Sequence, residues 1–206
     1  MKQEIKDFIL NLYPIPRIVR WKKRRKLKNR NFTILCSNCM GGIIYHLVSD
    51  KFLSPTVNLR IDSKEFFKFL NHMDYYMSLQ IDFYDDLNIS YPLGKLGDIT
   101  IHFNHYHTKE EAVLKWEERK KRINWNNVYI ITNDLDGVTE EDINSIKDFP
   151  CHNIIVFTHR HYMDIPYTYY VGDKEQLMKM LKKSVLTGLY EFERWFDYSN
   201  FLNKYK

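Results

Sequence analysis

The segment FTILCSNCMGGIIYHLVSD, residues 32–50, carries two cysteines and a Gly-Gly pair between two apolar stretches. Cys39 would lie in the turn between a strand and a helix, where the helix N-terminus favours the nucleophilic thiolate. Asn38, Gly41 and Gly42 suit a sharp turn, and the amides that open the helix could bind an anion or an oxyanion. We therefore take Cys39 as the candidate nucleophile; the alternative is a small buried residue beside glycines that only form the turn.

Two other chemistries fit these cysteines less well. Cys36 and Cys39 have the CxxC spacing of thioredoxin-like redox sites, but Ser-Asn replaces the usual Gly-Pro or Pro-His centre. A structural zinc needs a second pair of ligands, and Cys151 and His152 are adjacent in the sequence and so poorly spaced for that geometry.

Histidines cluster around the end of a predicted strand at 98–104. His102 alternates with apolar neighbours along this strand. His105 comes just after its end, where a general base could face the nucleophile. For each of them the alternative is a histidine packed in the core or in a loop.

A candidate anion-binding face follows on the next predicted helix. Lys115, Arg119 and Arg122 are spaced four and three residues apart, so they share one helix face and could clamp a phosphate or a carboxylate. The alternative is a solvated face on which these cations pair with nearby glutamates.

A pair of carboxylates ends the predicted strand at 128–133. Asp134 and Asp136 have the DxD spacing with which many glycosyltransferases hold Mg or Mn on a nucleotide-sugar diphosphate. The alternative is an Asp-Gly turn that closes the strand.

The elements that must position these residues alternate between strand and helix. Strands are predicted at 31–37, 56–61, 98–104, 128–133 and 153–158, and helices at 41–51, 63–78, 108–123, 139–147 and 173–183. Thr108 with Glu111 gives the third helix a capping box, and Thr139 with Asp142 gives one to the fourth. This alternation predicts a single layered α/β domain with a largely parallel sheet.

The charge distribution separates the first 30 residues from the rest. Residues 17–30 hold nine Lys or Arg and no acid, and subtracting nine from the net charge of +5 leaves −4 elsewhere. An apolar stripe over residues 5–12 precedes this basic block, as in segments that bind anionic membranes. We therefore predict an amphipathic basic segment at 1–30 and an α/β domain at 31–206.

These features also predict a location for the protein. The chain carries no apolar run long enough to span a membrane, and its first residues do not have the pattern of a signal peptide. We expect a cytoplasmic protein, peripheral at the inner face of the cell membrane through residues 1–30. No specific nucleic-acid partner is expected, because the remainder of the chain is acidic overall.

Several motifs together resemble an uncharacterised bacterial family whose members are commonly labelled exopolysaccharide biosynthesis proteins. They are SNC-GG, SPT at 54–56, YPLGKLGDITIHFNHY, EEA--KWEERKKRIN and the stretch from TNDLDG to FTH. The resemblance covers roughly residues 31–165 and implies a role in surface polysaccharide assembly. Cys39 matches the family pattern, whereas Leu135 stands where the family often has Arg. The resemblance also supports the anion-binding set and adds Asn124 to it, because the family pattern is matched closely at Lys115, Trp116, Arg119, Arg122 and Asn124.

Three hypotheses follow from the motifs and the resemblance. The first is an acyltransferase acting on a glycan or lipid-linked glycan precursor, with Cys39 as nucleophile, His102 or His105 as base, and the cationic helix face holding an acyl-CoA donor. The second is a glycosyltransferase whose two aspartates hold a divalent metal. The third is a non-catalytic component that binds glycan or organises the assembly enzymes.

Overall fold

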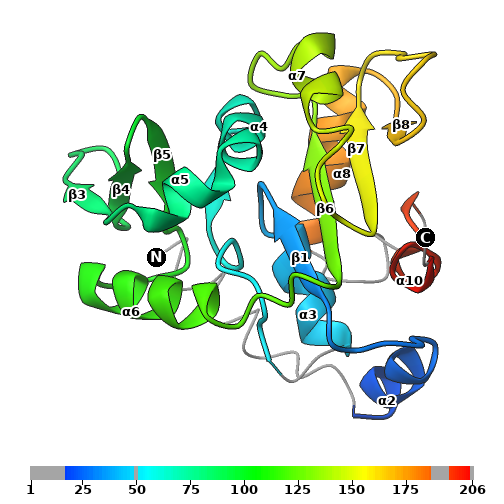
Figure 1. The fold of residues 1–206 in the computed structure, drawn as a ribbon, viewed down its shortest axis with the longest axis horizontal. Coiled ribbons are helices and arrows are strands. Elements are labelled where there is room, and N and C mark those ends of the chain that lie inside the picture. The colour runs from blue at the N-terminus through cyan, green and yellow to red at the C-terminus, as the bar shows by residue number, and fades with distance from the viewer. Residues whose placement is uncertain (1–16, 49–50, 187–194, 205–206) are drawn as a thin grey trace.

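The computed structural model describes residues 17–48, 51–186 and 195–204, which form two four-stranded sheets with helices around them (Figure 1). Sheet A has the strand order β1 (Thr33–Cys36), β6 (Val128–Asn133), β7 (Asn153–Thr158) and β8 (Thr168–Tyr170), and every pair in it is parallel. All six residues of β6 are buried. A strand buried on both faces reads as a continuous apolar run, which is how the sequence predicted β6.

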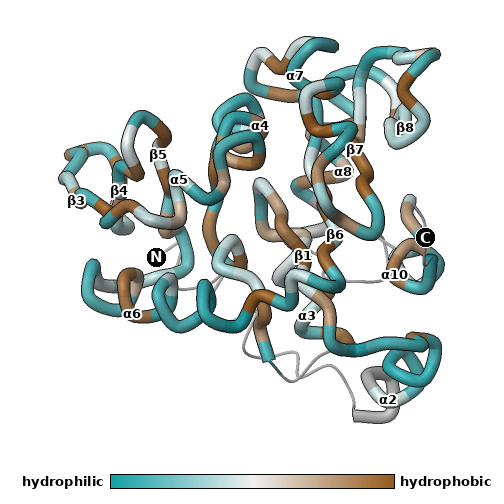
Figure 2. The backbone as a smooth tube through the Cα atoms, viewed as in Figure 1, coloured by the Kyte–Doolittle hydropathy of each residue, from teal (hydrophilic) through white to brown (hydrophobic). Residues whose placement is uncertain are grey.

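Helices cover both faces of sheet A because successive side chains along each strand point to opposite faces. One face packs on α3 (Met40–Val48), α8 (Lys174–Leu186) and α10 (Tyr198–Asn203), in a core that includes Ile34, Tyr129 and Phe157. The other packs on α4 (Ser63–Asn71) and α7 (Glu140–Ser145), in a core that includes Leu35 and Ile130. Figure 2 shows the apolar residues concentrated along the central strands of this sheet.

Two of the predicted strands lie in a second sheet, sheet B, and not in the parallel sheet. β2 (Arg60–Ile61) and β5 (Ile99–His102) pair antiparallel in this second sheet, in the order β2, β5, β4 (Leu93–Leu96) and β3 (Asp82–Tyr84). The physical reason is a tight hairpin: Leu96 pairs with Ile99, and Gly97 between them has a φ of 63°. A two-residue loop of this kind joins antiparallel strands only. The α/β class is therefore confirmed, with an antiparallel sheet added to the parallel one.

The helices follow the predicted pattern with shifted ends. The predicted helix 63–78 is divided into α4 and α5 (Met73–Ser78), because His72 between them has a non-helical backbone with φ −129° and ψ 37°. In α6 (Lys109–Lys120) the Thr108 side chain accepts a hydrogen bond from the Glu111 amide, and α7 begins with a complete capping box at Thr139. These caps satisfy amides that would otherwise lack a partner within the helix.

Residues from the basic block form α2 (Arg17–Arg25), while the apolar stripe predicted for residues 5–12 lies outside the described residues. Across the described ranges, every helix falls short of the length and apolar character that a membrane span requires.

The start of α3 packs closely on the end of β1. A Cβ atom added at Gly41 would lie 3.0 Å from the Cβ of Cys36 and 3.3 Å from the Cγ2 of Ile34. At Gly42 the nearest atom would be the side-chain oxygen of Asn58, at 2.9 Å. The Gly-Gly pair therefore permits the close approach of a helix to the strand before it and to the segment beside it.

We expect Gly41→Ala to lower the free energy of unfolding by about 1–2 kcal/mol, because the new methyl group meets a Cβ that is fixed by the backbone of β1. Gly42→Ala is the matched control and should cost less, since the side chain of Asn58 can rotate away. Urea unfolding of both variants measures the difference. A Gly41→Ala protein as stable as its parent would contradict the packing described for α3.

Candidate catalytic cysteine site

The site is centred on a contact between a cysteine and a histidine that are 66 positions apart in the sequence. The Sγ of Cys39 lies 3.1 Å from the Nε2 of His105, and both side chains are partly buried. Cys39 immediately precedes α3, and its carbonyl accepts a hydrogen bond from the Ile43 amide at 3.1 Å. His105 follows β5. A thiol within hydrogen-bond reach of an imidazole can transfer its proton to the ring when it attacks an electrophile.

The contact forms because the turn after β1 is bonded to sheet B. The amide of Ile61 in β2 donates to the carbonyl of Ser37 at 2.9 Å. Ile61 in turn pairs with Ile101 of β5, so the end of β5 lies beside the turn. The site thus lies at the carboxyl edge of sheet A, where open α/β folds bind their ligands.

Asn104 is a further polar group at the cysteine. Its Nδ2 lies 3.9 Å from the Sγ of Cys39, and it directly precedes His105 in the sequence. At this distance the amide is close to a donor position for an oxygen on a group bonded to the sulfur. Sequence reasoning missed Asn104; its place beside the candidate base, just after a strand, was the available signal.

The first cysteine of the CxxC sequence has a different role from the second. Cys36 is 1% exposed, and burial raises the pKa of its thiol to about 12, although hydrogen bonds from the amides of Asn38, Gly41 and Met40 oppose the shift. All three cysteines of the chain are thiols rather than disulfides. A thiol that stays protonated at neutral pH is a poor redox nucleophile.

The side chain of Asn38 bonds within the turn that carries the two cysteines. The amide of Met40 donates to the Oδ1 of Asn38 at 3.0 Å, and the same oxygen lies 3.4 Å from the Sγ of Cys36. The side chain of Asn38 thus bonds to two groups of the turn and stabilises it. The oxyanion role predicted for amides near Gly41 stays a prediction, and Asn104 is the donor that the geometry offers on the side of Cys39.

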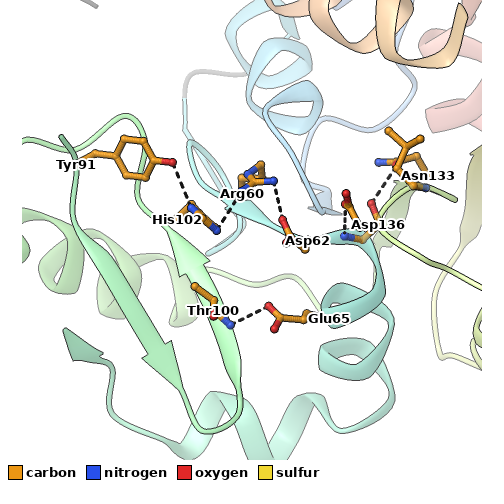
Figure 3. A network of polar contacts seen from close by, with 10 residues as sticks. Arg60, Asp62, Glu65, Tyr91, Thr100, His102, Asn133 and Asp136 are labelled. Carbon is orange, nitrogen blue, oxygen red and sulfur yellow. Dashed lines mark hydrogen bonds and ion pairs between the residues drawn. The ribbon is translucent and has the colours of Figure 1, made fainter. Parts of the chain in front are cut away.

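His102, the other candidate base, belongs to a separate polar network in sheet B (Figure 3). Its Nε2 lies 3.0 Å from the Nη2 of Arg60, and its Nδ1 lies 3.2 Å from the hydroxyl of Tyr91. Burial, and next the charge of Arg60, lowers the pKa of His102. Since a guanidinium only donates, Nε2 must accept, so the ring proton lies on Nδ1 and points to Tyr91. Arg60 also forms an ion pair with Asp62 at 2.6 Å.

The three cations of the predicted anion-binding face have different environments. Arg119 is 5% exposed and donates to the Val57 carbonyl at 2.8 Å and to the hydroxyl of Tyr106. Lys115 and Arg122 remain at the surface, where both pair with the same carboxylate oxygen of Glu118. The structure therefore does not bring the three cations together as a clamp. Arg119 instead links α6 to the segment before β2. Anion binding by the set stays a prediction.

Asn124 organises a turn beneath β1. Its amide donates to the hydroxyl of Thr33 at 2.8 Å, and its side-chain Nδ2 donates to the carbonyl of Asn31 at 2.7 Å. These contacts join the segment before β6 to the start of β1. Asn124 therefore stabilises this turn, and its role in ligand binding stays a prediction.

The two aspartates of the DxD sequence bind different partners. The buried carboxylate of Asp134 lies 2.7 Å from the Nδ1 of His159, and its two oxygens share the backbone N–H of that residue. Asp136, with a φ of 58°, accepts from the amide of Ser63 at the start of α4 at 2.9 Å. Within the described ranges, no group of three or more His, Cys, Asp or Glu could hold a metal ion. The metal role of Asp134 and Asp136 stays a prediction.

Fold and site together define a mixed α/β protein with a cysteine and a histidine in contact at the carboxyl edge of its parallel sheet. The model of the family described as "Domain of unknown function (DUF1919)" matches residues 14–203. A protein of Haemophilus influenzae described as uncharacterized is 36% identical over 188 residues, which cover 87% of this chain and 88% of the relative. The chain belongs to this family, and the predicted membership of a family of unknown function is confirmed.

The two cysteines of the turn should differ sharply toward iodoacetamide. Near neutral pH we expect Cys39 to be alkylated in the folded protein, because it contacts an imidazole, and Cys36 to react only after denaturation, because its thiol is buried and protonated. Peptide mass spectrometry after timed alkylation measures both rates. Equal rates in the folded protein would contradict the environments described for the two sulfurs.

Arg119 and Arg122 provide a matched pair that tests the structural assignment of the helix. Arg119→Ala removes a buried cation with two acceptors and should cost about 2–4 kcal/mol of stability. Arg122→Ala removes an exposed ion pair and should change stability by no more than about 0.5 kcal/mol. Chemical denaturation distinguishes them. If both substitutions are neutral, Arg119 does not anchor α6 as described.

Proposed function

We propose that this protein is an acyltransferase that forms a thioester on Cys39. The observation that carries the proposal is the 3.1 Å contact between the Sγ of Cys39 and the Nε2 of His105. A nucleophile and a base within hydrogen-bond reach are the two parts that acyl transfer through a covalent intermediate requires. Of the two histidines considered as base, His105 is favoured because His102 is bonded to Arg60 and Tyr91.

The first half of the reaction loads the enzyme. His105 Nε2 takes the proton of the Cys39 thiol as the sulfur attacks the carbonyl carbon of an acyl thioester such as an acyl-CoA. The carbonyl oxygen becomes an oxyanion, toward which the amide of Asn104 can donate. When the carbonyl re-forms, the bond to the donor sulfur breaks, and the departing thiolate receives the proton from His105.

The second half transfers the acyl group to a hydroxyl. His105 Nε2 takes the proton of the acceptor hydroxyl as its oxygen attacks the acyl carbon on Cys39. The bond between that carbon and the sulfur breaks, and the cysteine thiolate regains the proton from the imidazolium. One thioester and one alcohol thus give one ester and one thiol, without an oxidant or a metal.

The acceptor we propose is the hydroxyl of a bacterial surface glycan or of its lipid-linked precursor. This part rests on the resemblance to proteins labelled as exopolysaccharide biosynthesis proteins and on no contact in the structure. The glycosyltransferase hypothesis would require Asp134 and Asp136 to exchange their bonds to His159 and Ser63 for a metal ion. A non-catalytic glycan-binding protein would need no reactive thiol.

Acylation of the protein is the direct test. Incubation with acetyl-CoA and other short acyl-CoAs should add one acyl group to the peptide that carries Cys39, as seen by mass spectrometry. Cys39→Ala should abolish this adduct, whereas Cys151→Ala, the matched cysteine control, should retain it. Acylation that survives in Cys39→Ala would remove the thiol mechanism.

The base is tested with the two histidines. His105→Gln should slow acylation by about 100-fold or more, which is the usual contribution of a positioned base, while His102→Gln should leave the rate near that of the parent. Asn104→Ala should also slow it, by an amount typical of a lost oxyanion donor, about 10²-fold. Equal loss in both histidine variants would show that His105 has no special part.

A further inference from the structure

The basic block of the chain consists of α2 and the segment after it, and it is docked on the domain rather than being a linker in solution. Within it, Lys23 and Leu27 are buried, and Leu27 packs in the same core as α3 and α10. The amide of Lys28 donates to the Oδ1 of Asn203 at 2.8 Å, and the Nδ2 of Asn203 donates to the carbonyl of Lys26 at 2.7 Å. These bonds to α10 fix the orientation of the end of α2 and of the segment after it.

The other side chains of this segment include a set that is exposed to solvent. We name this set the α2 basic surface; it consists of Trp21, Lys22, Arg25, Lys26, Lys28 and Arg30, all of them exposed. Trp21 is 53% exposed, and the guanidinium of Arg25 lies 4.6 Å from the centre of its ring. The hydrophilic character of this segment is visible in Figure 2, where it extends from α2 toward β1.

We propose that the α2 basic surface binds an anionic lipid bilayer. Two of its five exposed cations lie in α2 and three in the segment just after it, and each cation close to negative lipid headgroups adds to the attraction. A partly exposed tryptophan with a cation over its ring suits the headgroup region, because its ring is apolar and its N–H is polar. The proposal is independent of the reaction at Cys39 and supplies a reason for this protein to meet lipid-linked substrates.

Charge distribution favours lipid over nucleic acid as the partner. The nine cations of residues 17–30 lie in one block, whereas the rest of the chain carries a net charge of −4 after these nine are subtracted from +5. A nucleic acid follows a groove or stripe over a larger part of a protein, where acidic surroundings would repel its phosphates. A flat anionic membrane needs only the one face.

The test is co-sedimentation of the full chain with vesicles of phosphatidylcholine alone and with about one third phosphatidylserine. Binding should require the anionic lipid and should weaken as salt shortens the range of electrostatic attraction. Replacing Lys22, Arg25 and Lys26 with Glu should lower the partition coefficient by about 100-fold or more, since three attractive charges become repulsive. Trp21→Ala should lower it several-fold without changing the salt dependence.

The matched control reverses three exposed lysines elsewhere, Lys64, Lys174 and Lys179, so that both triple variants have the same net charge. The control should bind vesicles as the parent does, and circular dichroism should show both variants folded. The proposal is overturned if the two triple variants lose binding equally, if neutral vesicles bind as well as anionic ones, or if the parent binds duplex DNA and no vesicles.

Discussion

The candidate site depends on a polar junction between the two sheets, made where the chain leaves β1 at Ser37. This residue is 1% exposed. Its carbonyl accepts a hydrogen bond from the amide of Ile61 in sheet B, and its hydroxyl accepts one from the hydroxyl of Thr132 in sheet A at 3.0 Å. A buried polar group without a partner costs about 1–3 kcal/mol, so breaking this junction is unfavourable at each bond. Cys39 comes two residues after Ser37, and His105 follows the strand that pairs with Ile61. Their contact is therefore a consequence of how the sheets are joined.

A second set of bonds supports the same junction through α4. The hydroxyl of Ser63 donates to the Oδ1 of Asn133, and its amide donates to Asp136, whose negative charge is favourable at a helix N-terminus. Further along α4, Glu65 accepts the amide of Thr100 in β5 at 2.9 Å (Figure 3). Polar residues at the carboxyl edge of sheet A thus fix the helix that lies between the two sheets. Asp136, predicted as a metal ligand, has this positional role, and Asn133 shares it.

The local sequence predicted where helices and strands lie better than it predicted which strands pair with one another. The apolar run of β6 and the capping residues Thr108 and Thr139 identify their elements within a few positions, because burial on both faces and the pairing of amides are local demands. The antiparallel sheet could not be predicted, since β2 has only two residues and β3 has three, none of them buried.

The candidate site was predictable in part for the same reason. Cys39 stood out by its turn, but the choice of His105 over His102 depends on long-range contacts that no periodicity reveals. Cys36 and Cys39 lie three residues apart, yet the thiol of the first is buried with a raised pKa and the thiol of the second contacts an imidazole. Because the junction at Ser37 brings His105 to Cys39, it is a requirement of the proposed chemistry as well as of the fold.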